Sequence, residues 1–207
     1  MDIHFTKMHG LGNDFIVLNN LHNEYQLSTQ QIAALGDRHF GVGFDQLLLI
    51  EAASEPGIDF SYRVFNADGQ EVEHCGNGAR CFAKYVTDKG LADGGSLVVK
   101  TVNRILTLNI ADNGDITVDM EAPVFDAGKI PFIADSDSNL HTRQLTVLGN
   151  QVDVEFCVLS MGNPHAVIRV EEIDNTAVKE IGKALGSHPH FPEGCNVGFM
   201  QLCDRNT

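Results

Sequence analysis

The 207-residue sequence predicts an α/β fold that is built from two similar halves. Short runs of alternating or β-branched apolar residues predict many strands, and three amphipathic stretches predict helices between them. Two short motifs also recur in the same order in the two halves, which indicates an internal duplication. We place the halves at residues 1–122 and 123–207, because the Pro- and Gly-containing run 123–139 is typical of a domain connection.

In the first half, strand-like runs come before each predicted helix. A helix is expected over residues 28–39, where Ser28 and Gln31 have the spacing of a capping box, and Gly41 and Gly43 are expected to end it. A second helix is expected directly after Cys75, where apolar residues begin to recur every three or four positions. Strands are expected at residues 3–7, 15–18, 44–51, 62–65, 96–102, 105–110 and 116–120.

Turn signals separate these strands. Asn66 opens the sequence N-A-D-G, whose Asp-Gly pair favours positive φ, so the chain is expected to reverse there.

The second half of the chain is expected to have a similar order of strands and helix. It predicts a hairpin from 143–149 and 151–159, a strand at 166–170, a helix at about 176–185 that ends at Gly186, and a strand at 198–202.

The duplication is visible in two pairs of motifs. Gly12-Asn13 recurs as Gly162-Asn163, and V-G-F-D-Q-L at 42–47 recurs as V-G-F-M-Q-L at 197–202. This alignment pairs Gln46 with Gln201. It places a counterpart of Cys75 near position 230, which lies beyond the 207 residues of the sequence.

Cys75 lies directly before a predicted helix, a position that favours a reactive thiol. The first amides of a helix have no partner inside the helix and carry the positive end of its dipole, so they favour a thiolate or a bound carboxylate. Gly76 and Gly78 leave the backbone open to such an anion, and His74 and Arg80 add positive charge nearby. The alternative is that Cys75 is a small apolar residue buried beside a glycine turn.

Composition excludes several function classes. The formal net charge is −14 and no basic run is present, so a nucleic-acid partner is not expected. No apolar run approaches the roughly 20 residues that span a bilayer, and the N-terminus has no signal-peptide core, so no membrane partner and a cytoplasmic location are expected. Five dispersed cysteines predict free thiols, and no metal motif such as C-x-x-C or H-E-x-x-H is present.

A duplicated fold with a cysteine at each helix start suits one type of reaction. One thiolate removes an α-hydrogen from an amino acid, the opposite thiol returns a proton, and the helix amides stabilise the charge on the carboxylate between these steps. Such a reaction inverts a stereocentre, and it needs no metal and no pyridoxal cofactor.

The motifs G-L-G-N-D-F, N-A-D-G-Q-E-V-E-H-C-G-N-G-A-R-C, M-G-N-P-H-A-V and F-P-E-G-C-N-V-G-F-M-Q resemble those of the diaminopimelate epimerase family. The resemblance extends over the whole chain. It implies two pseudo-symmetric domains, each a curved mixed sheet around a central helix, and cofactor-independent interconversion of LL- and meso-2,6-diaminopimelate for lysine and peptidoglycan synthesis. It assigns Cys75 as a catalytic acid/base and His165 as the residue that tunes cysteine ionisation. The substrate-binding residues that it implies are Asn13, Gln46, Asn66, Gly76, Asn77, Asn163 and Asn196.

The sequence also departs from the family pattern. The family continues with a Glu-Arg pair and a second C-G-[ST]-G, which these 207 residues do not contain. We therefore expect the second domain to be incomplete, and the 207-residue polypeptide to be inactive or impaired. The resemblance also implies a homodimer for the full-length family. Three other functions stay open: an amino-acid-binding fragment, a related racemase such as a proline racemase relative, and a cysteine-nucleophile hydrolase.

Overall fold

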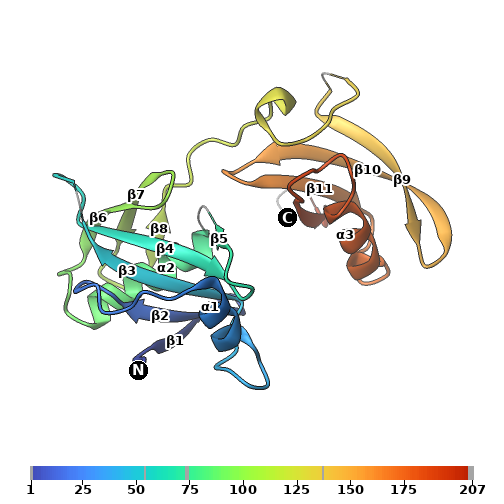
Figure 1. Cartoon of the computed structure of the whole chain (residues 1–207). Helices are drawn as coiled ribbons and strands as arrows, with labels where there is room; N and C mark the ends of the chain where they lie inside the picture. Colours follow the sequence, from blue (N-terminus) through green and yellow to red (C-terminus); the bar gives the residue numbers. More distant parts are fainter. Residues whose placement is uncertain (1, 54, 73–74, 137, 205–207) are drawn as a thin grey trace. The chain divides into compact units, whose positions relative to one another are not determined.

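The computed structural model describes residues 2–53, 55–72, 75–136 and 138–204, and it contains two compact units, Met1–Met120 and Glu121–Thr207 (Figure 1). Both units combine a β-sheet with few helices, so the predicted α/β fold class is confirmed. Within the described ranges, no helix has both the length and the apolar composition that are needed to cross a bilayer.

Unit 1 contains an eight-stranded mixed sheet. Its main path runs β1-β2-β3-β4-β6-β7-β8, and β5 pairs with β4. The β2–β3 and β4–β6 pairs are parallel, and the other pairs are antiparallel. The strands are β1 (Thr6–Gly10), β2 (Asn13–Asn19), β3 (Gln46–Ala52), β4 (Phe60–Asn66), β5 (Glu71–Val72), β6 (Gly95–Lys100), β7 (Ile105–Ile110) and β8 (Ile116–Val118).

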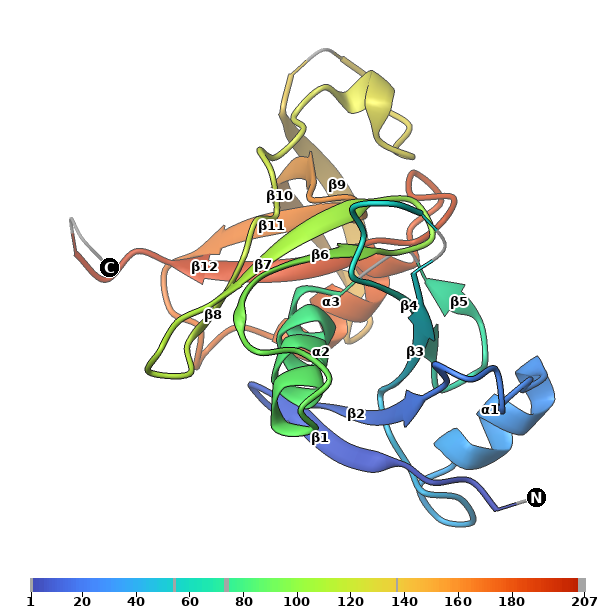
Figure 2. The same cartoon turned by 90° about the vertical axis from the view of Figure 1, so that its left-hand side faces the viewer.

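The sheet of unit 1 curls around helix α2 (Gly76–Asp88). α2 contacts both β1 and β8, which are the two ends of the strand path, and Figure 2 shows the helix enclosed in this way. Alternate residues of the central strands, such as Phe15 and Leu48, point to α2 and are fully buried. Tyr62 stacks on Phe82 of α2 with ring centroids 4.9 Å apart. The predicted curved sheet around a central helix is therefore confirmed in this unit.

Helix α1 (Thr29–Gly36) covers the opposite face of the sheet. The capping box is confirmed, because Ser28 and Gln31 exchange both of its hydrogen bonds. The helix ends earlier than predicted. Asp37 is extended, and its carboxylate accepts from the backbone N–H groups of His39 and Phe40, so the chain turns before Gly41 and Gly43 are reached.

The predicted reversal of the chain after Asn66 is also confirmed, and this turn packs against the start of α1. Gly69 has φ +83°, and a Cβ at this position would lie 2.3 Å from the carbonyl oxygen of Thr29. Both the backbone conformation and the close approach therefore require glycine at this turn.

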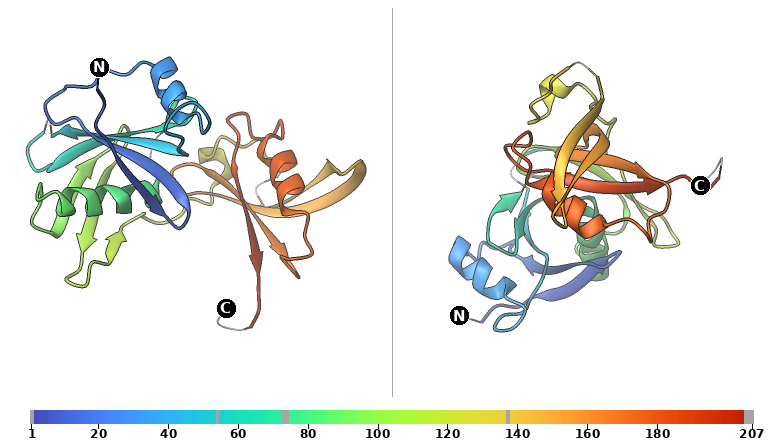
Figure 3. Two further views of the ribbon diagram at one scale, coloured as in Figure 1. Left: turned by 90° about the horizontal axis from the view of Figure 1, so that it is seen from below. Right: turned by 90° about the vertical axis from the view of Figure 1, so that its right-hand side faces the viewer.

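Unit 2 repeats the scheme with fewer strands. Its sheet has the order β12-β11-β10-β9, in which only β11 and β12 are parallel. Helix α3 contacts both edge strands, β9 and β12, so this sheet also curves around its helix (Figure 3). The elements are η1 (Ala127–Lys129), β9 (Leu140–Val147), β10 (Asn150–Ser160), β11 (Pro164–Val170), α3 (Val178–Gly186) and β12 (Asn196–Gln201).

Strand register corrects one of the sequence predictions about the duplication. Phe15 pairs with Gln46 in the parallel β2–β3 pair, and His165 pairs with Asn196 in the parallel β11–β12 pair. The counterpart of Gln46 is therefore Asn196, whereas Gln201 lies at the far end of β12. The letter match V-G-F-x-Q-L is out of register, because in the first half it lies mostly before the strand and in the second half mostly within it.

Candidate active site

Three amide side chains gather at one end of the unit 1 sheet, on the face that α2 covers. Asn13, Gln46 and Asn66 alternate in phase with residues of the core around α2. Gln46 is paired with Asn66 across β3–β4, and the neighbouring β2 begins at Asn13. The strand ends thus bring together three predicted site residues that are far apart in the sequence.

Cys75 lies at the start of α2. It is the N-cap residue, with extended backbone angles of φ −142° and ψ 120°, and its side chain makes no capping hydrogen bond. Its half-buried thiol instead donates to Asn13 Oδ1 at 3.6 Å. The predicted helix start after Cys75 is confirmed. His74, which the sequence also suggested, lies outside the described residues.

Glycines allow the start of α2 to approach the strands closely. A Cβ at Gly78 would lie 3.2 Å from Leu48 Cδ2 and 3.4 Å from Phe15 Cε1. A Cβ at Gly10 would lie 3.3 Å from the Cβ of Asn77. The small residues therefore hold the first turn of α2, including Gly76 and Asn77, against the ends of β1, β2 and β3.

The Gln46 amide is poised to accept a hydrogen bond. Gln46 Nε2 donates to Asn66 Oδ1 at 3.0 Å. Gln46 Oε1 is buried and has no hydrogen-bond partner among the described residues. A buried acceptor without a partner is costly, and a ligand N–H group placed there would satisfy it.

Asn77 and Arg80 interact with each other on the first turn of α2. The Arg80 guanidinium donates to Asn77 Oδ1, which fixes the Asn77 side chain. The sequence placed Arg80 beside Cys75 as a source of positive charge, and the structure adds that its guanidinium binds Asn77. The part of Asn77 that is best placed for a carboxylate is therefore its backbone N–H at the helix start.

Two further ionisable groups lie in the core next to Cys75. Burial, followed by the negative charge of Cys75, raises the pKa of the Tyr62 hydroxyl well above its ordinary value. The same two causes, in the same order, raise the pKa of the Cys81 thiol to about 11. Both groups therefore stay protonated near neutral pH, so neither suits the role of a base.

In unit 2, His165, Asn163 and Asn196 form a second group. His165 Nδ1 lies 2.9 Å from the carbonyl oxygen of Asn163. A carbonyl only accepts, so Nδ1 carries the hydrogen, and in the neutral ring Nε2 is left as the proton acceptor. Asn196 is paired with His165 across β11–β12. This group belongs to unit 2, whereas Cys75 belongs to unit 1.

Two half-buried thiols of unit 2, Cys157 and Cys195, do not suit acid–base chemistry. Burial raises the pKa of Cys195 to about 11, and burial also raises the pKa of Cys157. Both thiols stay protonated near neutral pH, so neither suits the role of a base. In the part of the chain that the structure describes, no cluster of three or more His, Cys, Asp or Glu side chains could hold a metal ion.

Sequence reasoning missed a charged group that supports Asn13. Asp14 and Asp45 both accept from Arg38, at 2.7 and 2.8 Å, and Asn13 Nδ2 donates to Asp45 Oδ2 at 3.1 Å. The Arg38 hydrogen bonds hold the pKa of the Asp14 carboxyl far below its ordinary range, and Lys7 and Asp45 lower it further. A signal was present, because each acidic residue is adjacent to a predicted amide ligand in the sequence, Asn13-Asp14 and Asp45-Gln46.

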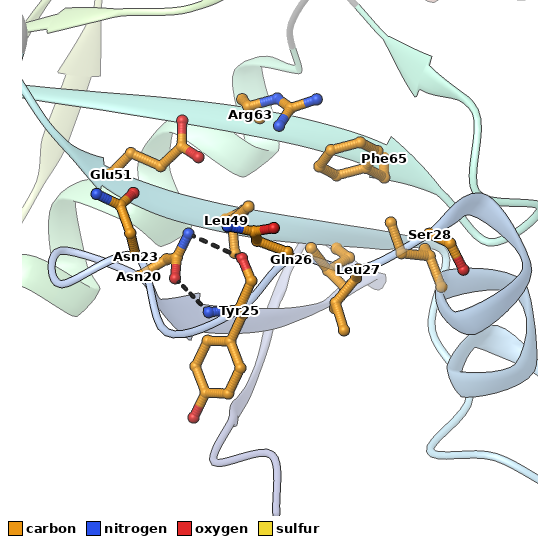
Figure 4. Close-up of a pocket in the computed structure, with 12 residues that line it drawn as sticks. Asn20, Asn23, Tyr25, Gln26, Leu27, Ser28, Leu49, Glu51, Arg63 and Phe65 are labelled. Carbon is orange, nitrogen blue, oxygen red and sulfur yellow. Dashed lines mark hydrogen bonds between the residues drawn. The ribbon is translucent and has the colours of Figure 1, made fainter. Parts of the chain in front are cut away.

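A pocket of about 540 Å³ lies on the other face of this sheet. Figure 4 shows its lining, where Asn20 forms two hydrogen bonds with the backbone of Tyr25. Its walls include Leu47 and Leu49, which alternate with Gln46 and Leu48 and therefore face away from α2. None of the predicted site residues lines it, so this pocket is separate from the candidate active site.

The fold resembles solved structures of low sequence identity. A probable proline racemase from Agrobacterium radiobacter K84 matches with a TM-score of 0.62 and 12% identity, over 99% of this chain and 68% of that one. A hydroxyproline epimerase from Agrobacterium vitis matches with a TM-score of 0.57 and 12% identity, over 83% of this chain and 53% of that one. These matches support the fold.

Sequence comparison identifies the family within this fold. The family model described as diaminopimelate epimerase matches residues 5–125. A diaminopimelate epimerase from Ralstonia pickettii (strain 12J) is 48% identical over all of this chain and 72% of its own length. One from Pseudomonas paraeruginosa is 48% identical over 99% of this chain and 72% of its own length. The chain belongs to the diaminopimelate epimerase family, whose members are isomerases.

Proposed function

We propose that this chain provides the Cys75 side of a cofactor-independent epimerase site that interconverts LL- and meso-2,6-diaminopimelate. The observation that carries the proposal is the position of the Cys75 thiol. It lies at the N-terminus of α2, within hydrogen-bonding distance of Asn13 and beside a strand end that presents Gln46 and Asn66. The same site would serve lysine and peptidoglycan precursor synthesis.

The first chemical step is proton abstraction. The Cys75 thiolate takes the α-hydrogen as a proton and becomes a thiol, and the electron pair of the broken C–H bond moves into the carboxylate. The backbone N–H groups of Gly76 and Asn77, at the positive end of α2, stabilise the enediolate-like charge that develops there. The second cysteine thiol, which the family resemblance implies on the opposite face, would donate its proton to the α-carbon, become a thiolate and so complete the inversion.

Amide side chains suit the rest of this substrate. Diaminopimelate carries an ammonium and a carboxylate at each end, so it offers both donors and acceptors. Gln46 Oε1 would receive an ammonium hydrogen, while the amides of Asn13 and Asn66 line the same strand ends. For unit 2, the family resemblance proposes Asn163 and Asn196 as substrate-binding residues and His165 as the residue that tunes cysteine ionisation, and the acceptor nitrogen of His165 suits that role.

The test measures two events separately. The 207-residue polypeptide is incubated with LL- or meso-diaminopimelate in D₂O, and mass spectrometry and chiral chromatography follow α-deuterium and the epimer ratio. We expect deuterium incorporation at one α-carbon, and its loss in C75S. Lysine and proline serve as control substrates, and calorimetry reports binding of each compound. Absence of both binding and exchange with diaminopimelate would refute the proposal, as would preferential exchange of proline.

The sequence-based expectation that the 207-residue polypeptide epimerises poorly is a separate prediction. Deuterium incorporation without a change in epimer ratio would support it. Full epimerisation by this polypeptide would show that expectation to be wrong.

A further inference from the structure

The Asn13 carboxamide is held between a carboxylate and a thiol. Its Nδ2 donates to Asp45 Oδ2 at 3.1 Å, and its Oδ1 accepts from Cys75 Sγ at 3.6 Å. An amide nitrogen only donates and an amide oxygen only accepts, so the bond to Asp45 decides which end faces Cys75. Turning the amide over would place two acceptors, Asn13 Oδ1 and the Asp45 carboxylate, against each other.

Asp45 is itself held in one orientation. Its Oδ2 also accepts from the backbone N–H of Asp14 at 3.0 Å, and its Oδ1 accepts from Arg38 Nη2 at 2.8 Å. Arg38 donates through both terminal nitrogens to Asp14, at 2.7 and 3.1 Å, and this two-bonded geometry orients the guanidinium. A continuous chain of hydrogen bonds therefore runs from Arg38 through Asp45 and Asn13 to Cys75.

The duplication provides an internal comparison for this arrangement. On the strand register, Asp14 corresponds to Pro164 and Asp45 corresponds to Cys195. The β11–β12 pair nevertheless forms the same parallel geometry as β2–β3. The two carboxylates are thus not needed for strand pairing, and they occur in the half of the chain that carries Cys75.

We propose that Asp45 is a positioning residue that acts through Asn13. By holding Asn13 Nδ2, it presents Asn13 Oδ1 as an acceptor to the group that sits beside Cys75. This inference rests on the proposed function, because in that reaction the group is the α-ammonium of an amino acid, which donates hydrogen bonds. Asp45 itself does not contact the substrate. It determines that the oxygen end of the Asn13 amide, and not the nitrogen end, does so.

Nuclear magnetic resonance of the 207-residue chain tests the first half of the proposal without substrate. In the wild type, one Asn13 Nδ2 hydrogen is bonded to a carboxylate, so we expect a downfield shift and slow exchange with solvent. D45N should abolish this signature. The new amide has one oxygen, and the charged Arg38 guanidinium binds it more strongly than the neutral backbone N–H of Asp14 does, so the NH₂ group of the new amide faces Asn13. D14N and E71Q are controls that remove a carboxylate paired with Arg38 or with Arg63, and both keep the Asp45 carboxylate to which Asn13 Nδ2 donates. If the wild type shows no protected Asn13 Nδ2 hydrogen, the proposal is wrong, even where D45N fails to fold.

The pH profile of Cys75 alkylation by iodoacetamide tests the second half. In D45N the Asn13 amide turns, a donor replaces the acceptor at Cys75, and the thiolate is stabilised. We expect the midpoint of the profile to move to lower pH by more than in D14N, which removes an equal charge. In the N13A background, D45N and D14N should have equal effects, because Asp45 then has no amide to orient. Equal effects of D45N and D14N with Asn13 present would overturn the proposal. These readouts contain no amino-acid substrate, so they fail or succeed independently of the epimerase assay.

Discussion

Cys75 is the N-cap residue of α2 and Cys81 lies inside the same helix, and the two thiols differ in exposure. Cys81 is 4% exposed and packs in the core around α2, whereas Cys75 is half-buried and contacts Asn13. Because α2 starts beside the strand ends that carry Asn13 and Gln46, Cys75 lies next to polar side chains, whereas Cys81 packs among apolar ones.

The first prediction concerns the order of thiol modification. A thiol with a pKa of about 11, as in Cys81 and Cys195, is only about one part in a thousand thiolate at pH 8. We expect iodoacetamide to modify Cys75 well before Cys81 and Cys195, with diaminopimelate slowing the reaction at Cys75. Peptide mass spectrometry follows each site, and C75S is the control. Modification of Cys195 before Cys75 would contradict this order.

The second prediction concerns Gln46. Q46L removes a buried acceptor that has no partner among the described residues, and it also removes the donor to Asn66. These effects oppose each other, so the free energy of unfolding should change by less than about 1 kcal/mol. The affinity for diaminopimelate should fall about tenfold, equivalent to about 1.4 kcal/mol.

Urea denaturation and calorimetry check the two quantities for Gln46, with Q70L as a control that changes an exposed glutamine in the β4–β5 turn. A large loss of stability in Q46L with unchanged affinity would show that Gln46 is a structural residue.

The third prediction concerns the close approach at Gly78. In G78A the new Cβ would lie 3.2 Å from Leu48 Cδ2, so the start of α2 must move or the core must yield, at a cost of about 1–3 kcal/mol. The α-hydrogen exchange rate should fall as well, because the first turn carries the amides that face the carboxylate.

G182A is the matched control for Gly78. Gly182 lies in α3, where a Cβ would be 3.8 Å from Phe199, so alanine should fit and stabilise the helix by about 0.8–1 kcal/mol. Thermal unfolding of both variants gives opposite signs if the close approach at Gly78 is real. Stabilisation by G78A would argue against it.

The fourth prediction concerns pH and unit 2. His141 is 5% exposed, its Nε2 has no partner within the described residues, and its ring lies 4.7 Å from that of Phe132. Burial, followed by the charge of Arg143, holds the pKa of His141 below its ordinary value of 6.5, and Asp135 opposes this effect. As the pH falls below about 6.5, the unfolded chain binds a proton that folded His141 does not, so stability is lost until the lower folded pKa is passed.

H141F should therefore reduce the loss of stability between pH 7.5 and 5.5. Hydrogen exchange of the β9 and β10 amides reports the opening free energy of unit 2 at each pH. The pKa of His188 is also lowered, chiefly by burial, so part of the pH dependence should persist in H141F. H22F controls for the loss of an exposed histidine. An unchanged pH dependence in H141F would exclude His141 as its source.

The sequence by itself determined the features that depend on neighbouring residues. The capping box of Ser28 and Gln31, the Asp-Gly turn before Gln70 and the helix start at Cys75 are all found where the sequence predicts them. Each depends on contacts within a few positions, so the local residue types are sufficient. The α/β class followed from these elements, and the family from the motifs.

Only the tertiary structure decided which distant residues meet. The register of β2 against β3 brings Asp45 to Asn13, and the register of β11 against β12 makes Asn196, rather than Gln201, the counterpart of Gln46. A parallel strand pair joins segments separated by a crossover helix, and a shift along the pair changes every contact without changing any local pattern. The support of Asn13 by Asp45 therefore became visible only when the strands were paired.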